Sequence, residues 1–477
     1  MEKDNKLGLF GMVSLIIGST IGSGIFTTAA DMAANGAHSG AVLVGWTIAG
    51  IGMIALMMCF FGLNQKRPDL TNGIYSYASE GFGEFVGFNS AWGYWISALL
   101  CNVSYLTLFF GAIGYFVPAF GDGGNIVSIV CGSILLWVLH FLVCRGVKEA
   151  AGLQLIVTAA KLIPLFVFII AIIVVRAFDP EIFFNNMWGD GSMSVMDQVK
   201  ATTGATVWSF IGVEGAVVLS GRARKSSDVG KASIIGFAGL IAIYVLIALL
   251  CFGSVTPEQM AEMNSPQLAY ILEDAVGPWG AALINLGVVL SLAGALLGWT
   301  IIASECSYAA AKQGVFMNVF TKENKKEAPV NALLITNGII QAFLIISYFS
   351  DAAYQLFYNL SANMIMIPYL FSGAYYFKIA MKKEGFENDS AGAVAMARFW
   401  GLLGTIYGCW MLYSAGISYL AVSAVLYVAG MVVFALGKKE KNLPVFAKGY
   451  EKGIAVALVV LGVFAVYLVV SGSVAVL

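Results

Sequence analysis

The sequence predicts an all-α, polytopic membrane protein, and three observations lead to that fold class. Of its 477 residues, 59% are hydrophobic and 11% are charged, whereas an ordinary soluble domain carries roughly 25% charged residues. The apolar residues form long continuous runs, which is typical of membrane-spanning helices and not of the alternating strands of a β-barrel. The basic residues fall mainly in alternate short loops. These features exclude a disordered chain, a secreted soluble enzyme and a nucleic-acid-binding protein.

About thirteen transmembrane helices account for the apolar runs, because each span needs about 20 apolar residues. We predict spans at residues 9–33, 40–63, 86–118, 126–144, 153–175, 202–220, 232–253, 279–304, 331–349, 355–377, 399–416, 418–436 and 454–476. Ser414, Gly416 and Ser418 leave only a tight turn between the eleventh and twelfth spans. An odd number of spans puts the two termini on opposite sides of the membrane.

Lysine and arginine residues predict the orientation, because loops rich in them stay on the cytoplasmic side. With a cytoplasmic N-terminus, 23 of the 26 basic residues fall in cytoplasmic loops. Three of the alternate loops contain no lysine or arginine and are predicted to be external: 119–125, 254–278 and 350–354. We therefore expect a multi-pass protein of an inner or plasma membrane with an external C-terminus.

Two spans contain stretches that a plain lipid-facing helix would avoid. The first has three glycines and three hydroxyl residues at 18–24, and the sixth has a glutamate and two glycines at 208–215. Their separation of five helices predicts a 5+5 inverted repeat in which helices 1 and 6 are broken and a half-helix N-terminus holds an anionic group. Close helix packing through Gly18 and Gly22 is a compatible alternative.

Two charged residues are predicted inside the membrane. A carboxylate at mid-span costs a few kcal/mol, so Glu214 is a candidate for proton uptake, with a hydrogen-bonded structural role as the alternative. Lys161 in the fifth span provides either a fixed positive charge where another transporter would hold Na⁺ or a titrating group. The alternative for Lys161 is that its side chain reaches back to the inner surface.

Aromatic and polar residues at mid-depth complete the candidate site. Trp208, Trp299 and Tyr94 lie away from the interfacial belts where Trp and Tyr usually concentrate. Aromatic faces attract a cationic side chain by up to about 2 kcal/mol when desolvated, although core packing explains any one of them equally. Ser97 and Asn102 in the third span are candidates for hydrogen bonds to a substrate or between helices.

Enzyme motifs are missing from the sequence. It has two histidines and no HExxH, GxSxG or P-loop pattern, and the GxG of the first span follows no strand. We expect no enzymatic activity, no metal and no cofactor. A channel or a transporter-like sensor is an alternative of a different class, but a channel would line a pore from several helices, whereas polarity here collects in the first, third and sixth spans.

Four motifs carry a family resemblance: GSTIGSGIF at 18–26, NGIYSYASEGFG at 72–83, WSFIGVEG at 208–215 and GWTIIAS at 298–304. Together with the span pattern, they make nearly the whole chain resemble the basic amino acid and polyamine antiporters of the amino acid, polyamine and organocation transporter superfamily. Within that family, VGFNSAWGYWIS at 86–97 and RGVKEAA at 145–151 look most like arginine/ornithine antiporters.

The resemblance implies a fold like that of the sodium-coupled leucine transporter, with two inverted five-helix repeats. The implied parts are a cytoplasmic N-terminus 1–8, a first repeat 9–175, an external loop 176–200, a second repeat 201–377, helices 11 and 12 at 378–436, a basic cytoplasmic loop 437–453 and an additional C-terminal helix 454–477. Most members have twelve helices, so the sequence suggests no role for the last one.

The resemblance also implies roles for single residues. The residues implied to bind the substrate are Thr20, Ser23, Gly24, Ser97, Asn102, Trp208, Ile211 and Trp299. Those implied to gate or couple transport are Tyr75, Tyr94, Glu214 and Lys161. Among the first group, Thr20, Ser23 and Gly24 would hold the α-carboxylate and ammonium. Cys101 and Tyr105 also lie near this site in the third helix.

The expected function is secondary antiport that takes in arginine and releases ornithine by alternating access, without ATP. The alternative in the same class is exchange of another amino acid for its decarboxylation product: histidine/histamine, tyrosine/tyramine, lysine/cadaverine or arginine/agmatine. The expected partners are small amino acids and the lipid bilayer, with no nucleic acid, and a homodimer is compatible with the sequence.

Overall fold

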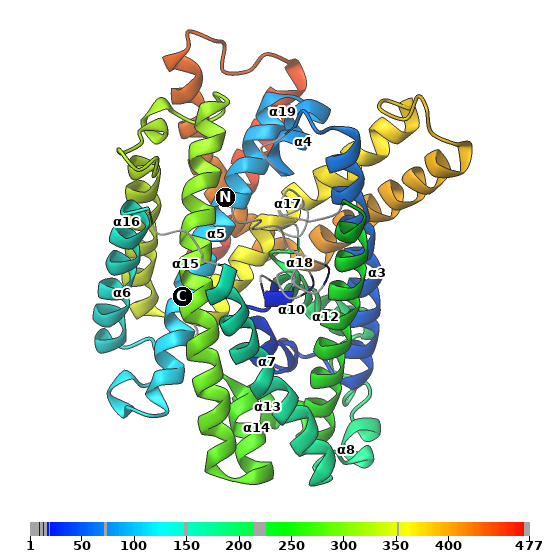
Figure 1. The fold of residues 1–477 in the computed structure, drawn as a ribbon, viewed down its shortest axis with the longest axis vertical. Coiled ribbons are helices and arrows are strands. Elements are labelled where there is room, and N and C mark those ends of the chain that lie inside the picture. The colour runs from blue at the N-terminus through cyan, green and yellow to red at the C-terminus, as the bar shows by residue number, and fades with distance from the viewer. Residues whose placement is uncertain are drawn as a thin grey trace, which may run out of the picture. The chain divides into compact units, whose positions relative to one another are not determined.

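The computed structural model describes residues 17–18, 20–70, 74–146, 151–213, 226–350 and 353–471, together with Leu9 and Val13. Within these ranges the chain is helical and contains no β-strand, which confirms the predicted all-α class. In chain order the elements are η1 Gly24–Phe26, α2 Thr28–Ala34, α3 Ser39–Lys66, α4 Ile74–Phe82, α5 Glu84–Gly114, η2 Pro118–Phe120, α6 Ile126–Cys144, α7 Ala151–Val174, α8 Pro180–Asn185, α9 Val195–Ala201, α10 Thr203–Phe210, α12 Ser226–Ser254, α13 Pro257–Glu262, α14 Gln267–Val276, α15 Pro278–Lys312, η4 Asn318–Thr321, α16 Val330–Ile346, η5 Ser347–Phe349, α17 Ala353–Lys382, α18 Ala391–Glu440 and α19 Gly449–Val470 (Figure 1).

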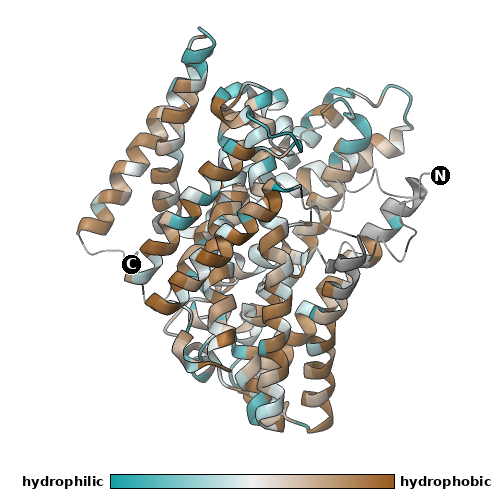
Figure 2. Ribbon diagram, turned by 60° about the vertical axis from the view of Figure 1, so that its left-hand side comes forward, coloured by the Kyte–Doolittle hydropathy of each residue, from teal (hydrophilic) through white to brown (hydrophobic). Residues whose placement is uncertain are grey.

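Ten helical segments of the described chain are long and apolar enough to cross a membrane. They are Ser39–Lys66, Glu84–Gly114, Ile126–Cys144, Val157–Val174, Ile234–Ser254, Pro278–Lys312, Val330–Phe349, Ala353–Lys382, Tyr419–Glu440 and Gly449–Val470. Figure 2 shows hydrophobic residues along the long helices and hydrophilic residues mainly at helix ends and in loops. The chain is therefore a multi-pass membrane protein. The total of thirteen spans and the division into two repeats stay predictions.

The first, sixth and eleventh predicted spans are not among these ten, for different reasons. The first and sixth are interrupted within the described residues, as detailed below. The eleventh is the helical first part of α18, which is separated from the twelfth by Gly416, whose φ is 75° and ψ is 156°. A positive φ suits glycine because it has no Cβ, so the predicted tight turn at this position is confirmed.

The chain forms two compact units, each built from segments that are discontinuous in sequence. Unit 1 comprises residues 1–54, 105–132 and 149–296, and unit 2 comprises residues 55–104, 133–148 and 297–477. Helices α3, α5, α6 and α15 contribute residues to both. This grouping is spatial, so it differs in kind from the successive repeats that the resemblance implies.

Aromatic side chains fill the core of each unit. In unit 1, Trp46 stacks on Tyr244 with ring centroids 5.5 Å apart and contacts Phe210 edge-on at 5.9 Å. In unit 2, the ring centroid of Trp95 lies 5.2 Å from that of Trp92 and 5.6 Å from that of Phe316. Aromatic pairs at such separations add about 0.5–1.5 kcal/mol beyond their buried area. The first cluster packs α10, the helix interrupted at Phe210, against its neighbours in unit 1. The second cluster packs α5 against the loop after α15 in unit 2.

Candidate functional site

The first predicted span is interrupted within its glycine-rich stretch. Helical conformation ends at Thr20, Ile21–Ser23 are non-helical, the 3₁₀ turn η1 follows, and α2 begins at Thr28. The last amide of the first helical part, that of Ile21, donates to the carbonyl of Ile17 at 3.0 Å. Because the helix stops there, the carbonyls that follow that of Ile17 receive no amide from a continuing helix. The sequence-predicted break in helix 1 is therefore confirmed.

Lys161 of α7 binds the carbonyls that this break exposes. Its Nζ donates to the carbonyl oxygens of Gly18 at 2.9 Å and Ile21 at 2.8 Å, and the side chain is buried. A cation stabilises the C-terminal end of a helix, where the macrodipole is negative. The Lys161 ammonium therefore lies at the break, and the alternative in which it reaches back to the inner surface is wrong. Its role as a fixed charge or as a titrating group stays a prediction.

The 3₁₀ turn η1 begins at Gly24, and the side chain of its N-cap residue, Ser23, makes no capping hydrogen bond to its amides. Uncapped amides at a helix start are a favourable site for an anion, because the N–H groups and the positive end of the dipole point the same way. Gly24 allows close approach here, since a Cβ on it would lie 3.1 Å from Cδ1 of Trp208. This geometry suits a carboxylate.

Trp208 of α10 lies against this turn. Its Nε1 donates to Oγ of Ser23 at 3.2 Å, and its ring meets Tyr105 of α5 in a T-shaped contact with centroids 5.6 Å apart. Trp208 is buried, and so is Ile211, which caps the end of α10. Unit 1 therefore brings together four of the residues implied to bind the substrate: Ser23, Gly24, Trp208 and Ile211.

The sixth predicted span is interrupted just after Trp208. Helix α10 ends at Phe210, Ile211 has an extended ψ of 127°, and Gly212 has a φ of 103° that favours glycine. The predicted break in helix 6 is thus confirmed up to Val213. Glu214, the predicted coupling carboxylate, lies outside the described residues, and its role stays a prediction.

Sequence analysis missed two polar contacts that hold the broken stretch in place. Oγ of Ser291 on α15 donates to the carbonyl of Gly22 at 3.1 Å. The hydroxyls of Thr28 and Ser209 share a hydrogen bond of 3.0 Å that joins α2 to α10. Ser209 lies within a motif quoted above and Thr28 lies two residues after another, which was the available signal. Ser291 lies in an apolar stretch of α15 and adjoins no such motif.

A buried carboxylate was also missed. Asp31 of α2 is 1% exposed, and neither of its oxygens has a hydrogen-bond partner within 3.5 Å among the described residues. It lies one turn after Thr27. Burying a polar group without hydrogen bonds is costly. Asp31 is therefore an unusual residue in this otherwise mostly apolar buried helix.

The contact between Gly22 and Tyr105 gives a test of the site that needs no substrate assignment. A Cβ added to Gly22 would clash with the Tyr105 hydroxyl. We expect Gly22→Ala to lower the melting temperature measured by intrinsic fluorescence, because overpacking costs about 1–3 kcal/mol. Adding Tyr105→Phe removes the clashing oxygen and should recover part of that loss. A double variant no more stable than Gly22→Ala would contradict this packing.

Apart from Thr20 and Glu214, the other predicted site residues belong to unit 2. Ser97 shares a 3.0 Å hydrogen bond with Ser361 of α17, whose hydroxyl also donates to the Ser97 carbonyl at 2.8 Å, so Ser97 joins two helices. Asn102 is fully buried and donates to the carbonyl of Ala98, but its Oδ1 has no partner in the described part of the chain. Such an oxygen is available to a substrate donor.

Trp299 is buried on α15 and Tyr94 is half-buried on α5. Tyr75 lies in the first turn of α4. Thr20 is the last helical residue before the break in helix 1 and is buried. The part these residues play in binding or gating stays a prediction, as does that of the residues in unit 1.

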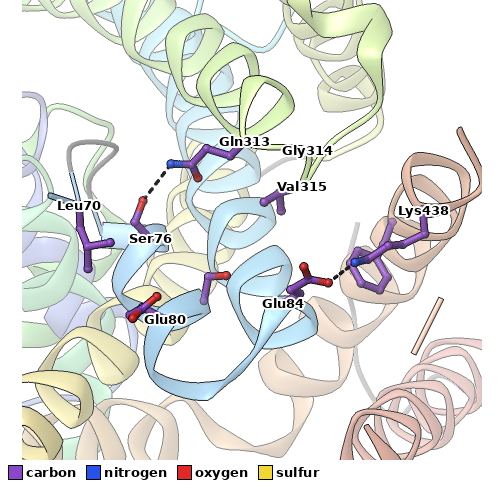
Figure 3. Close-up of a pocket in the computed structure, with 10 residues that line it drawn as sticks. Leu70, Ser76, Glu80, Glu84, Gln313, Gly314, Val315 and Lys438 are labelled. Carbon is purple, nitrogen blue, oxygen red and sulfur yellow. Dashed lines mark hydrogen bonds and ion pairs between the residues drawn. The ribbon is translucent and has the colours of Figure 1, made fainter. Parts of the chain in front are cut away.

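A cavity of about 240 Å³ lies in unit 2, and none of the residues implied to bind substrate is among those that line it. Its walls come from α4, the start of α5, the loop after α15 and the end of α18, and they include Ser76, Glu80, Glu84, Gln313 and Lys438. Figure 3 shows Gln313 bonded to Ser76 and Glu84 paired with Lys438 across it. These four side chains are thus paired with one another, and Glu80 pairs with Arg67 outside the lining.

Comparison with known proteins gives a family and close relatives. Residues 7–436 match the family described as amino acid permease. An arginine/ornithine antiporter of Pseudomonas aeruginosa is 43% identical over 475 residues, which cover 98% of each chain. An arginine/agmatine antiporter of Chlamydia felis is 38% identical and covers 97% of this chain and 96% of its own. Another from Chlamydia trachomatis is 40% identical over 89% of this chain and 88% of its own.

Proposed function

Because the chain belongs to the amino acid permease family, we propose that it is an amino acid antiporter that imports arginine in exchange for ornithine. The observation that carries this proposal is the 43% identity to the arginine/ornithine antiporter of Pseudomonas aeruginosa over 98% of both chains. The relatives are named as antiporters, which are transporters and not enzymes.

The broken stretch of unit 1 supplies a physical basis for binding an amino acid. The α-carboxylate of the substrate would accept from backbone amides at the start of η1, which begins at Gly24. The cationic side chain would lie against the Trp208 ring, where cation–π attraction adds to its binding. Guanidinium and ammonium groups both suit such a face, so one site accommodates arginine and ornithine in turn.

Alternating access follows from the same break. Two short helical parts joined by non-helical residues rotate more freely than one continuous helix, so the site opens to one side at a time. Lys161 keeps the exposed carbonyls satisfied throughout, and we propose that it replaces a bound cation. Glu214 would couple this movement to helix 6 through its protonation, so Glu214→Gln should flatten the pH dependence of exchange.

Exchange of arginine for agmatine is the second candidate, because two of the relatives compared above carry that name. The two candidates differ in charge. Arginine and ornithine each carry one net positive charge at neutral pH, since the guanidinium and the ω-amine are both protonated. Agmatine has no carboxylate and carries two.

We therefore predict that exchange is insensitive to membrane potential. Arginine/ornithine exchange moves no net charge, whereas arginine/agmatine exchange moves one charge per cycle, worth about 2.3 kcal/mol per 100 mV, or roughly fifty-fold in the equilibrium ratio. Potassium gradients with valinomycin set the potential in proteoliposomes. An arginine accumulation that changes by tens of fold with potential would favour agmatine as the counter-substrate.

The orientation proposed for the chain has a cytoplasmic N-terminus and an external C-terminus in the inner or plasma membrane. The concentration of 23 of 26 basic residues in alternate loops supports it. Single cysteines placed in loops 119–125 and 437–453, in a variant without native cysteines, would test it by labelling of intact cells. The proposal includes a homodimer as an assembly state, which native mass spectrometry would count.

Counterflow in proteoliposomes tests the function. Vesicles loaded with unlabelled ornithine are given labelled arginine outside, with unlabelled arginine, ornithine, histidine, tyrosine, lysine or agmatine as competitors. We expect uptake to be inhibited most by arginine and ornithine and least by tyrosine. Stronger inhibition by histidine or tyrosine than by ornithine would overturn the cationic substrate class.

A further inference from the structure

The short connection between α4 and α5 is held by side chains from distant parts of unit 2. We name residues 81–85 the elbow; Gly83, with a φ of 97°, turns the chain there. The end of α4 leaves carbonyls unpaired and the start of α5 leaves amides unpaired, as at any helix end. Each of these groups needs a partner from elsewhere.

The carbonyls at the end of α4 are bound by two side chains. Nζ of Lys378 on α17 donates to the Gly81 carbonyl, and the Tyr450 hydroxyl on α19 donates to the Phe82 carbonyl at 2.9 Å. A cation at this position is also stabilised by the negative, C-terminal end of the α4 helix dipole. One of the two bonds therefore ties the elbow to the additional C-terminal helix.

The start of α5 is bound by the same C-terminal region. Glu451 is 2% exposed; its Oε1 accepts from the Phe85 amide at 3.5 Å and its Oε2 accepts from the amides of Ala447 and Lys448 at 2.8 and 3.0 Å. A carboxylate at a helix N-terminus is favourable. Glu451 therefore caps two helix starts, those of α5 and α19.

Two further contacts extend this attachment. Glu84 in the first turn of α5 forms an ion pair with Lys438 near the end of α18, across the cavity seen in Figure 3. Phe446, in the loop between α18 and α19, packs edge-on against Phe85 with ring centroids 5.3 Å apart. Residues 438–451 therefore contact the elbow, and the elbow follows the first turn of α4 within ten residues along the sequence.

We propose that residues 438–451 form a C-terminal latch that positions α4 and so sets the rate at which the transporter changes state. This inference rests on the proposed function, because Tyr75 in the first turn of α4 is one of the residues implied to gate the substrate path. Tyr450 and Glu451 are positioning residues: they act through the elbow and touch no substrate. The latch also gives the thirteenth predicted span a role, which is to anchor these two residues.

Hydrogen–deuterium exchange of the full-length protein in nanodiscs tests the latch directly. The variants are Tyr450→Phe, which removes one donor, and Glu451→Gln, which removes the charge. The matched control is Tyr467→Phe on the same helix, where the side chain is 65% exposed. We expect amides 81–88 to exchange at least threefold faster in both variants than in the control. Equal exchange in all three would overturn the latch.

Transport kinetics on the same proteins separate positioning from packing. In ornithine-loaded vesicles we expect the maximal rate of arginine uptake to change at least threefold in both variants, while KM for external arginine stays within twofold of the control. Faster amide exchange with an unchanged rate would overturn the positioning role. If the wild-type protein exchanges no arginine, the proposed function fails, and the amide-exchange result still decides whether the latch exists.

Discussion

Lys161→Met should abolish arginine exchange and destabilise the protein, the largest effect that we expect from any single substitution. The variant leaves the carbonyls of Gly18 and Ile21 buried without the ammonium that now binds both. An unsatisfied buried acceptor costs about 1–3 kcal/mol, so the free energy of unfolding should fall by about 2–6 kcal/mol. We expect exchange below one-tenth of wild type in vesicles kept well below the melting temperature.

Lys200→Met is the matched control. Lys200 forms an ion pair with Asp197 at 2.9 Å within helix α9, where a surface pair contributes about 0–1 kcal/mol. Its exchange rate and melting temperature should stay close to wild type. A Lys161→Met protein with wild-type exchange and stability would show that the ammonium does not hold the broken helix.

Trp208→Leu should reduce the exchange rate by about a hundred-fold, measured in vesicles kept well below the melting temperature because truncating this buried side chain also lowers stability. The substitution removes both the aromatic face proposed to hold the cationic side chain and the hydrogen bond to Ser23. Loss of a desolvated cation–π contact costs about 2 kcal/mol, and the hydrogen bond adds about 1 kcal/mol. Initial rates of labelled arginine uptake measure the combined effect.

Two further variants are compared with Trp208→Leu: one separates the aromatic ring from the indole hydrogen bond, and the other is a control. Trp208→Phe keeps an aromatic ring and loses the indole N–H, so we expect a reduction of about ten-fold or less. Trp279→Leu changes a tryptophan that is 55% exposed at the start of α15 and should transport normally. Equal losses in the Phe and Leu variants would assign the role of Trp208 to its hydrogen bond and contradict stacking on the substrate.

The positions of the helix breaks were predictable because composition marks them. Three glycines and three hydroxyls within 18–24 are conspicuous in an apolar span, and the structure ends the helix at Thr20. The same holds for Gly416, where the predicted turn occurs. Long apolar runs also revealed most spans, because the membrane requires each to be continuous.

The partners of single residues were not predictable in the same way. Lys161 stands out in the sequence as a buried charge, but its two acceptors are backbone carbonyls 143 and 140 residues away. Tyr450 likewise binds a carbonyl 368 residues distant. Every residue has a carbonyl, so such acceptors leave no mark on the sequence, and only the fold reveals which of them a helix break exposes.

The central claim is obligatory exchange of arginine for ornithine, and a double-label measurement tests it most directly. Proteoliposomes are loaded with ¹⁴C-ornithine and given ³H-arginine, and both labels are counted over the same time course. Obligatory exchange predicts one ornithine released for each arginine taken up, with negligible uptake into empty vesicles. Arginine that accumulates without release of ornithine, or at the same rate in empty vesicles, would contradict it.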